Sequence, residues 1–288
     1  RDLHLSLRRQ RQMCIRDRCP KNSGDKYGRT RTLKNALANS VNTVTARLID
    51  RIGPQTVVKL AKDLGIEQRI LPVPSIALGT PDLSVYEMVA AYSTFANKGV
   101  YTQPVFVQKI EDKNGTTLFE HQPVTKDVLS EEAAYVTVNL LEGVTMAGSG
   151  TRLRTTGADE YNRAYQNIVT GYPYEFTNPI AGKTGTTQNQ SDGWFIGMVP
   201  NLVTGVWVGA EDRAIHFEDI AYGQGASMAL PIWGVYMKSI YQDSTLMISN
   251  ESFDRPEKLT IELDCNKLVI DSIGSGKTTD QEILDIDF

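Results

Sequence analysis

The chain has 288 residues, of which 41% are hydrophobic and 22% are charged, and its net charge is −4. This composition is ordinary for one sizeable folded domain, and no stretch reaches the run of about 18 apolar residues that a membrane-spanning helix needs. The three Cys and three His residues are scattered, without the spacing of a disulfide framework or a metal site. We therefore expect no metal and no cofactor.

The first 18 residues differ from the rest, because they carry six Arg and two Asp. Residues 9–18 resemble translated sequencing-adapter sequence, so we predict a non-native leader at 1–18 and leave it out of the fold prediction. A basic arm that binds nucleic acid is the alternative. The segment has no interleaved aromatic residues and the remaining chain is acidic, so we expect no nucleic-acid partner.

Two helical stretches are predicted at residues 32–39 and 43–49, and they meet at the polar joint Ser40-Val41-Asn42. A Ser and an Asn two positions apart at such a joint can direct their side chains toward one point. The structural alternatives are a capping role for Ser40 and a turn-forming role for Asn42.

The next two helices have clear start signals. Ser84 and Glu87 form a capping box that opens a helix running to Phe95, and Gly99 is expected to cap its end. Ser130 precedes two Glu residues and then apolar residues at helical spacing, which predicts a second helix.

Strands are predicted between and after these helices. The apolar runs 105–110 and 116–119 flank Asn114-Gly115, which is a hairpin signal. Further along, the strand that contains residues 183–186 is followed by two apolar strands joined at a turn, residues 200–201. Three consecutive antiparallel strands are therefore expected.

The last predicted helix covers residues 226–241, with Pro231 near its first turn. Its apolar stripe is expected to face the core and consists of Ile232, Trp233, Tyr236, Met237 and Ile240. Residues 244–288 are predicted to form a C-terminal appendage or tail with one strand at 257–263. Residues 274–278 imitate the end of a phosphate-binding loop, but Asp271 replaces its first Gly, so we reject nucleotide binding.

The segment Lys183-Thr184-Gly185-Thr186 carries the groups that an anion-docking strand needs. Lys183 brings a positive charge, and Gly185 has no side chain to hold a substrate backbone away. Thr184 and Thr186 offer hydroxyl and backbone N–H groups. A peptide carboxylate can lie along such an edge, although an ordinary strand with a solvated Lys is the structural alternative.

Ser40-x-Asn42 and Lys183-Thr184-Gly185, in that order, resemble two of the three motifs of the penicillin-recognising serine acyltransferases. Over about residues 20–241 the chain is similar to the transpeptidase domain of class A, bifunctional penicillin-binding proteins. Further segments that carry this resemblance are Ile76-Ala77-Leu78-Gly79, residues 94–99, residues 193–197 and residues 203–209. We accordingly predict a partial transpeptidase domain at 19–243.

The resemblance implies an α/β (α+β) fold, in which an antiparallel sheet packs between helices as in penicillin-binding proteins and serine β-lactamases. The family's first two strands precede its nucleophile helix, so we expect the sheet to be truncated at its N-terminal side, with an open edge and marginal stability or aggregation.

The family's third motif, Ser-x-x-Lys, supplies the nucleophile, and here it occurs only at residues 23–26. We reject Ser23 as the nucleophile, because Gly24 and Asp25 favour a loop and the segment lies too close to Ser40. We expect no nucleophile in this chain, which would then be an inactive piece of a longer protein.

By resemblance, Ser40 relays a proton to the leaving nitrogen and Asn42 holds the substrate amide. Lys183 and Thr184 bind the terminal carboxylate, Gly185 lets the substrate strand approach, and the Thr186 N–H is an oxyanion donor. The loop at residues 148–151 resembles the flexible family loop ahead of this strand, and an ordinary helix stop is the structural alternative.

The implied reaction is D,D-transpeptidation of peptidoglycan, with stem peptides, a lipid-linked precursor and β-lactam antibiotics as partners. The implied parent is anchored in the bacterial inner membrane, faces the periplasm or exterior, and is also a peptidoglycan glycosyltransferase. A serine β-lactamase and a noncatalytic β-lactam or peptidoglycan sensor are the alternatives. No Glu-x-x-x-Asn deacylation segment lies between the two motifs, which favours the transpeptidase.

Overall fold

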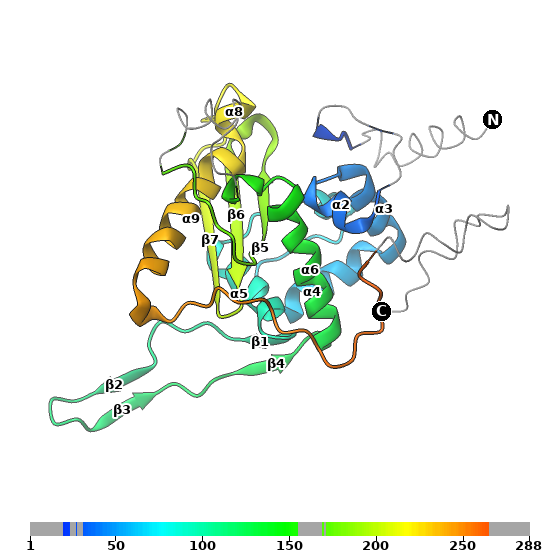
Figure 1. Cartoon of the computed structure of the whole chain (residues 1–288). Coiled ribbons are helices and arrows are strands. Elements are labelled where there is room, and N and C mark those ends of the chain that lie inside the picture. Colours follow the sequence, from blue (N-terminus) through cyan, green and yellow to red (C-terminus); the bar gives the residue numbers. More distant parts are fainter. Residues whose placement is uncertain (1–19, 24–26, 28–30, 155–168, 170, 265–288) are drawn as a thin grey trace. The chain divides into compact units, whose positions relative to one another are not determined.

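A computed structural model of the chain describes residues 20–23, 27, 31–154, 169 and 171–264 (Figure 1). Contacts divide the chain into two units, Arg1–Arg255 and Pro256–Phe288. The sequence placed the start of the appendage at residue 244. The strand expected at 257–263 was wrong, because the described part of the second unit contains no strand.

Three antiparallel strands form the central sheet of the first unit in the order β5-β6-β7, as the sequence predicted. Their bounds are β5 (Ala181–Thr186), β6 (Asp192–Val199) and β7 (Leu202–Gly209). Thr186 pairs with Gly193 at one end of the sheet, and Val199 pairs with Leu202 at the turn that closes the other end. Among the described residues, β7 pairs with β6 alone, so its outer edge is open.

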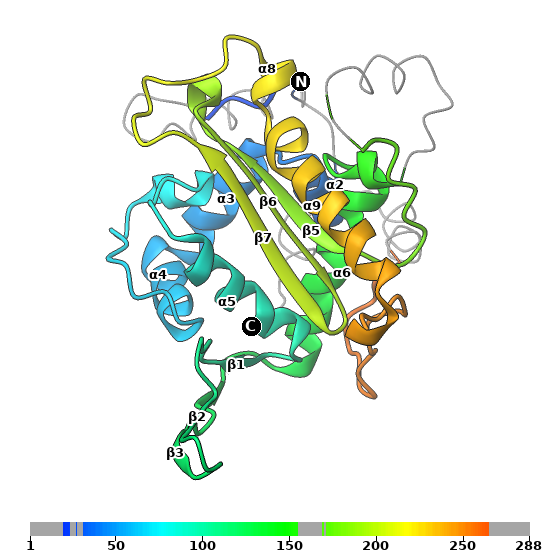
Figure 2. The same ribbon diagram turned by 90° about the vertical axis from the view of Figure 1, so that its left-hand side faces the viewer.

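Helices cover both faces of this sheet (Figure 2). One face carries α9 (Gly225–Gln242), while α5 (Val85–Ala96) and α6 (Glu131–Ala147) lie on the other. Trp233 of α9 packs so closely on β6 that a Cβ on Gly197 would lie 2.5 Å from its ring. An α+β fold with the sheet between helices is therefore confirmed.

The core-facing stripe predicted for α9 was partly wrong. Trp233 and Met237 are buried, but Ile232 is 51% and Tyr236 45% exposed. Successive helical residues are rotated by about 100°, so the residue before Trp233 turns away from the sheet. The buried stripe also contains Leu230, which brings the core contacts nearer the start of the helix.

The signals at the starts of α5 and α6 are confirmed. Ser84 and Glu87 make both halves of the capping box, and the Ser130 side chain accepts from the backbone of α6. The end of α5 differs from the prediction, because Asn97 is its C-cap. Gly99 follows at φ 91°, where a Cβ would lie 2.2 Å from the Leu129 carbonyl oxygen.

The N-terminal helices are α2 (Leu33–Ala38), α3 (Asn42–Ile52) and α4 (Pro54–Asp63). The predicted joint lies between α2 and α3, and Ser40 turns the chain there with φ 49°. A non-Gly residue at positive φ is uncommon. The conformation of Ser40 is therefore imposed by its surroundings.

The described part of the first unit also contains two small sheets and several short helices. The sheets pair β1 (Val100–Thr102) with β4 (Thr125–Asp127), and β2 (Lys109–Glu111) with β3 (Thr117–Glu120). The short helices are η2 (Pro74–Leu78), η3 (Thr151–Leu153), η4 (Gln188–Gln190), α8 (Ile220–Gly223) and η5 (Ser244–Leu246). The β2–β3 pair confirms the hairpin predicted around Asn114-Gly115.

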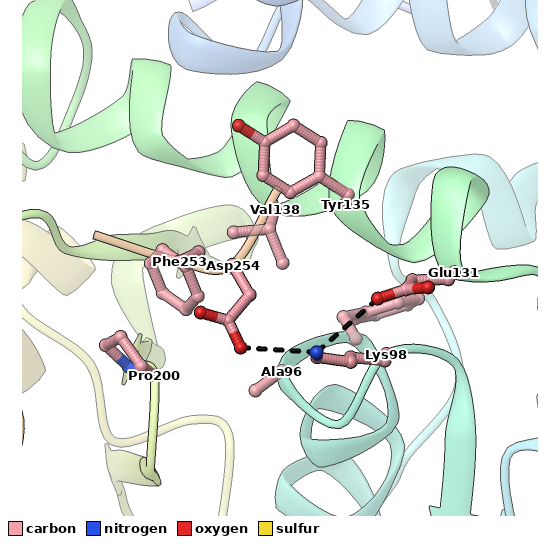
Figure 3. A pocket seen from close by; sticks show the side chains of 9 residues that line it. Ala96, Lys98, Glu131, Tyr135, Val138, Pro200, Phe253 and Asp254 are labelled. Atoms are coloured by element: carbon pink, nitrogen blue, oxygen red, sulfur yellow. Dashed lines mark ion pairs between the residues drawn. The ribbon is translucent and has the colours of Figure 1, made fainter. Parts of the chain in front are cut away.

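The segment after α9 returns to the helices beneath the sheet. Phe253 packs against the buried cluster that contains Val138, and Lys98 lies between Asp254 (3.2 Å) and Glu131 (3.5 Å) (Figure 3). These residues border a small cavity of about 40 Å³ beside Pro200. Because the strand pairing places this turn at the far end of the sheet from Thr186, the cavity is separate from the predicted site.

Candidate active site

The two motifs predicted from the sequence meet in space. The Lys183 ammonium in β5 donates a hydrogen bond to the Ser40 hydroxyl at the α2–α3 joint. The same ammonium donates to the Thr184 carbonyl oxygen at 2.8 Å. The cation is thus held between its own strand and the joint.

Lys183 is half-buried, and this burial lowers its pKa from 10.5 to about 8. Burial disfavours a charged amine, and no ion pair to Lys183 occurs among the described residues to offset the effect. Near neutral pH the amine is still mainly protonated. It can therefore attract a carboxylate or donate a proton.

Thr184 has a second partner, from the segment that follows α6. Its hydroxyl lies 2.5 Å from the Ser149 hydroxyl. The Ser149 backbone N–H donates to the Ala38 carbonyl oxygen at 3.0 Å, near the end of α2. A Cβ on Gly148 would lie 2.2 Å from the same oxygen, so the two backbones are in direct contact.

The outer end of β5 is joined to the start of α9. The Gly225 N–H donates to the Thr186 hydroxyl at 3.0 Å, and a Cβ on Gly225 would lie 2.2 Å from the Gly185 carbonyl oxygen. The absence of a side chain at Gly225 therefore allows the helix to approach the strand. This contact fixes the end of the strand that carries the predicted oxyanion donor.

Helix α2 is fixed against α6 behind the site. The Lys34 ammonium donates to the Asn139 side-chain oxygen at 2.9 Å. Gly143 lies beneath the Lys34 side chain, where a Cβ would lie 2.9 Å from Cγ. Burial raises the pKa of Glu142, and the positive charges of Lys34 and Arg154 offset part of this rise. The packing of α2 on α6 thus determines where Ser40 lies.

Asn42, the other polar residue of the joint, contacts the segment that precedes α2. Its side-chain N–H donates to the Lys21 carbonyl oxygen at 2.7 Å. Asn22 also contacts the start of α3, because its side-chain oxygen accepts from the Thr43 N–H at 3.1 Å. Residues 21–22 are thereby attached to the helix that follows the joint.

The structure therefore brings Ser40, Lys183 and Thr184 together, and it places Gly185 and Thr186 further along the same strand. The contact of Ser149 with Thr184 was not predicted from the sequence. Its signal was the small-residue run at 148–150, which the sequence assigned to a loop or helix stop. The segment 24–26 of the rejected Ser-x-x-Lys motif lies outside the described residues.

Two further properties of the described residues bear on the class of site. They contain no cluster of three or more His, Cys, Asp or Glu side chains that could hold a metal. Within the same part of the chain, no helix has the length and apolar character required to cross a membrane.

Comparisons with known proteins give the same family as the motifs. The family described as penicillin binding protein transpeptidase domain matches residues 10–214. Penicillin-binding protein 1A of Aquifex aeolicus is 36% identical over 88% of this chain and 31% of its own length. Penicillin-binding protein 2D of Bacillus subtilis is 34% identical over 72% of this chain and 27% of its own length. The chain thus spans about a third of each relative.

Solved structures agree at the level of the fold. Penicillin-binding protein 1A from Haemophilus influenzae has a TM-score of 0.67 at 24% identity, over 83% of this chain and 38% of that chain. PonA1 from Mycobacterium tuberculosis, solved with penicillin V, has a TM-score of 0.64 at 26% identity, over 83% of this chain and 63% of that chain. The chain belongs to the penicillin-binding-protein transpeptidase family, of D-Ala-D-Ala transpeptidase/carboxypeptidase type, and corresponds to the transpeptidase domain of 1A-type class A members.

Proposed function

We propose that this chain provides the carboxylate-binding and proton-relay part of a peptidoglycan D,D-transpeptidase site that also binds β-lactams. The observation that supports this best is the contact between Lys183 and Ser40, which joins motifs 143 residues apart in the sequence. Two motifs whose order alone suggested the family thus form one cluster.

The electrostatics of the pair suit both proposed roles. With a pKa of about 8, the Lys183 amine is mainly charged at neutral pH and attracts the terminal carboxylate of a stem peptide. Its hydrogen bond to Ser40 gives a path for a proton. Ser40 can pass its own proton to the leaving nitrogen and recover one from Lys183.

The remaining roles concern the substrate backbone. The Asn42 bond to Lys21 uses one side-chain N–H, which leaves its carbonyl oxygen to accept from a substrate amide. Gly185 gives the substrate strand room, and the Thr186 N–H is the proposed oxyanion donor. One such donor is worth about 3 kcal/mol of transition-state stabilisation in other enzymes.

The nucleophile of the proposed reaction is a Ser-x-x-Lys serine, which attacks the carbonyl of the D-Ala-D-Ala bond and forms an acyl-enzyme. An amine of a neighbouring stem peptide then completes the cross-link. Without that serine the chain is inactive by itself. The proposed parent is a membrane-anchored protein with an additional glycosyltransferase domain, which acts on lipid-linked precursor and carries this domain on the outer face of the cytoplasmic membrane.

The test uses fluorescent penicillin on the full chain and on a version extended upstream with a family-like Ser-x-x-Lys segment. We expect a covalent band within minutes on the extended chain and none on the chain as it stands. Lys183→Ala in the extended chain should reduce the labelling rate by about 100-fold. Lys59→Ala, which removes an exposed Lys from α4, is the matched control and should leave the rate unchanged.

Other labelling results would either refute the proposed roles or support one of the alternative functions. An extended chain that labels equally fast with and without Lys183 would refute the proposed roles. Labelling of the chain as it stands, lost in Ser23→Ala, would identify Ser23 as a nucleophile. Rapid release of the label would support a β-lactamase, and stable labelling with no cross-linking of peptides would support a sensor.

A further inference from the structure

Ser149 lies outside the two motifs, yet it contacts the centre of one of them. Its hydroxyl is 2.5 Å from the Thr184 hydroxyl, and both side chains are half-buried. A hydroxyl group has one hydrogen to donate and two lone pairs that accept. The direction of this bond therefore decides whether the hydrogen of Thr184 is available to a ligand.

The position of Ser149 is fixed by its backbone. Its N–H donates to the Ala38 carbonyl oxygen at 3.0 Å, and the preceding Gly148 has no space for a side chain beside that oxygen. The Gly150 N–H donates to the Val144 carbonyl oxygen at 3.0 Å, which ties the same segment to α6. The Ser149 hydroxyl is thus presented to β5 from a well-anchored turn.

Either hydroxyl can donate in this bond, and an anion bound beside Thr184 would select one direction. The Lys183 ammonium donates to the Thr184 carbonyl oxygen, so a positive charge lies beside this residue. An anion attracted by that charge needs donors, because a carboxylate only accepts hydrogen bonds. If Ser149 donates to Thr184, then Thr184 can donate to the anion.

We propose that Ser149 is a positioning residue that makes the site selective for ligands with a free C-terminal carboxylate. It donates to the Thr184 oxygen and so directs the Thr184 hydrogen toward the carboxylate. This inference rests on the proposed function, which places a carboxylate at Lys183 and Thr184. A C-terminal carboxamide would present its NH₂ hydrogens to the same donors and would be disfavoured.

The test measures binding of two peptides to the full chain by NMR titration. Both end in D-Ala-D-Ala, one with a free carboxylate and one with a carboxamide. Wild type should bind the carboxylate peptide about ten-fold more tightly, and Ser149→Ala should reduce this ratio by about five-fold, as expected for one misdirected hydrogen bond. Ser149→Thr keeps the hydroxyl and should restore the ratio.

Two controls separate positioning from folding. Ser93→Ala removes a hydroxyl from α5, where it donates to the Ala90 carbonyl oxygen, and should leave the ratio unchanged. Ser149→Cys keeps the size of the side chain with a weaker donor, so it should lower the ratio even if Ser149→Ala does not fold.

The outcomes distinguish this inference from the proposed function. A wild-type chain that prefers the carboxylate, with the same ratio in Ser149→Ala and Ser149→Cys, would overturn the role of Ser149 alone. Equal weakening of both peptides in these variants would also overturn it, because that indicates only a structural role. A wild-type chain with no preference would remove the proposed carboxylate site and this inference with it.

Discussion

Gly148 has no room for a side chain beside Ala38, because a Cβ there would lie 2.2 Å from the Ala38 carbonyl oxygen. The end of α2 therefore rests on the backbone that follows α6. Ser40 lies two residues beyond Ala38 and reaches Lys183 from this support. The contact between the two motifs thus depends on a glycine that belongs to neither.

Gly148→Ala should move α2 away from α6 and separate Ser40 from Lys183. Overpacking of this kind costs about 1–3 kcal/mol, so the free energy of unfolding should fall by that amount in urea titrations. Gly150→Ala is the graded control and should lower the free energy of unfolding less, because its Cβ would lie 3.3 Å from the Val144 carbonyl oxygen, a milder close contact, and its φ is negative. Equal stabilities of Gly148→Ala and wild type would contradict the close packing.

The lowered pKa of Lys183 predicts how stability depends on pH. The unfolded chain holds this proton up to a pKa of 10.5, whereas the folded chain loses it at about 8. Between these values the unfolded state binds more protons, so the free energy of unfolding should rise with pH. Below pH 8 the Lys183 amine is charged in both the folded and the unfolded state, so the full cost of burying its charge lowers the free energy of unfolding.

Lys183→Met isolates this effect from the other Lys and Tyr groups that titrate in the same range. At pH 7 the variant should be more stable than wild type by about 1–2 kcal/mol, since water near the half-buried amine screens part of the shift. The difference should shrink as the pH approaches 10.5. Ser40, which accepts from the Lys183 ammonium, and Ser149, which contacts the adjacent Thr184, carry no charge that changes in this range. A difference that is constant with pH would contradict the shift.

Much of the architecture was predictable because its signals are local. The capping box at Ser84 and Glu87 and the turn at Asn114-Gly115 each depend on residues close in sequence, and both were confirmed. The contact between Ser40 and Lys183 became predictable only through the resemblance. Nothing in the local sequence specifies a contact across 143 residues.

The errors concern properties that the tertiary structure decides. Ile232 is as apolar as its neighbours, and only the orientation of α9 on the sheet shows that it lies outside the core. The contact of Ser149 with Thr184 depends on the junction of α2 with α6, which periodicity does not reveal. Gly99 lies two residues beyond the C-cap Asn97, and although its N–H still donates to the Thr94 carbonyl oxygen of α5 at 2.8 Å, its backbone also passes close to Leu129.

The segment that follows α9 should be part of the cooperatively folded unit. Phe253 packs on the cluster beneath the sheet, and the contacts divide the chain after Arg255. A chain that ends at Arg255 should keep the melting temperature of the full chain. One that ends at Asp243 should melt at a lower temperature, because it loses the buried part of Phe253.

Two substitutions test which contact of this segment matters. Phe253→Ala should lower the free energy of unfolding by about 1–2 kcal/mol. Lys98→Met should change the melting temperature less, because the ion pairs of Lys98 with Glu131 and Asp254 are exposed. Equal melting temperatures of the chains ending at Asp243 and Arg255 would show that the segment adds nothing, and would favour the boundary predicted at 243.

The open edge of β7 predicts self-association. Its two faces are covered by α5 and α9, yet among the described residues no strand pairs with its outer edge, and Trp207 is 41% exposed. Unpaired strand edges are templates for pairing with another chain. Sedimentation velocity over a concentration series should therefore show species larger than the monomer as the concentration rises.

Trp207→Lys places a charge on this strand and should shift the distribution toward the monomer, since charged side chains disfavour edge pairing. Tyr222→Lys is the matched control, because it adds the same charge at an exposed position of α8, outside the sheet. If the edge is the cause, only the first variant changes the distribution. A wild-type chain that stays monomeric at every concentration and unfolds in one cooperative transition would show that the edge needs no partner, and would refute the expectation of marginal stability.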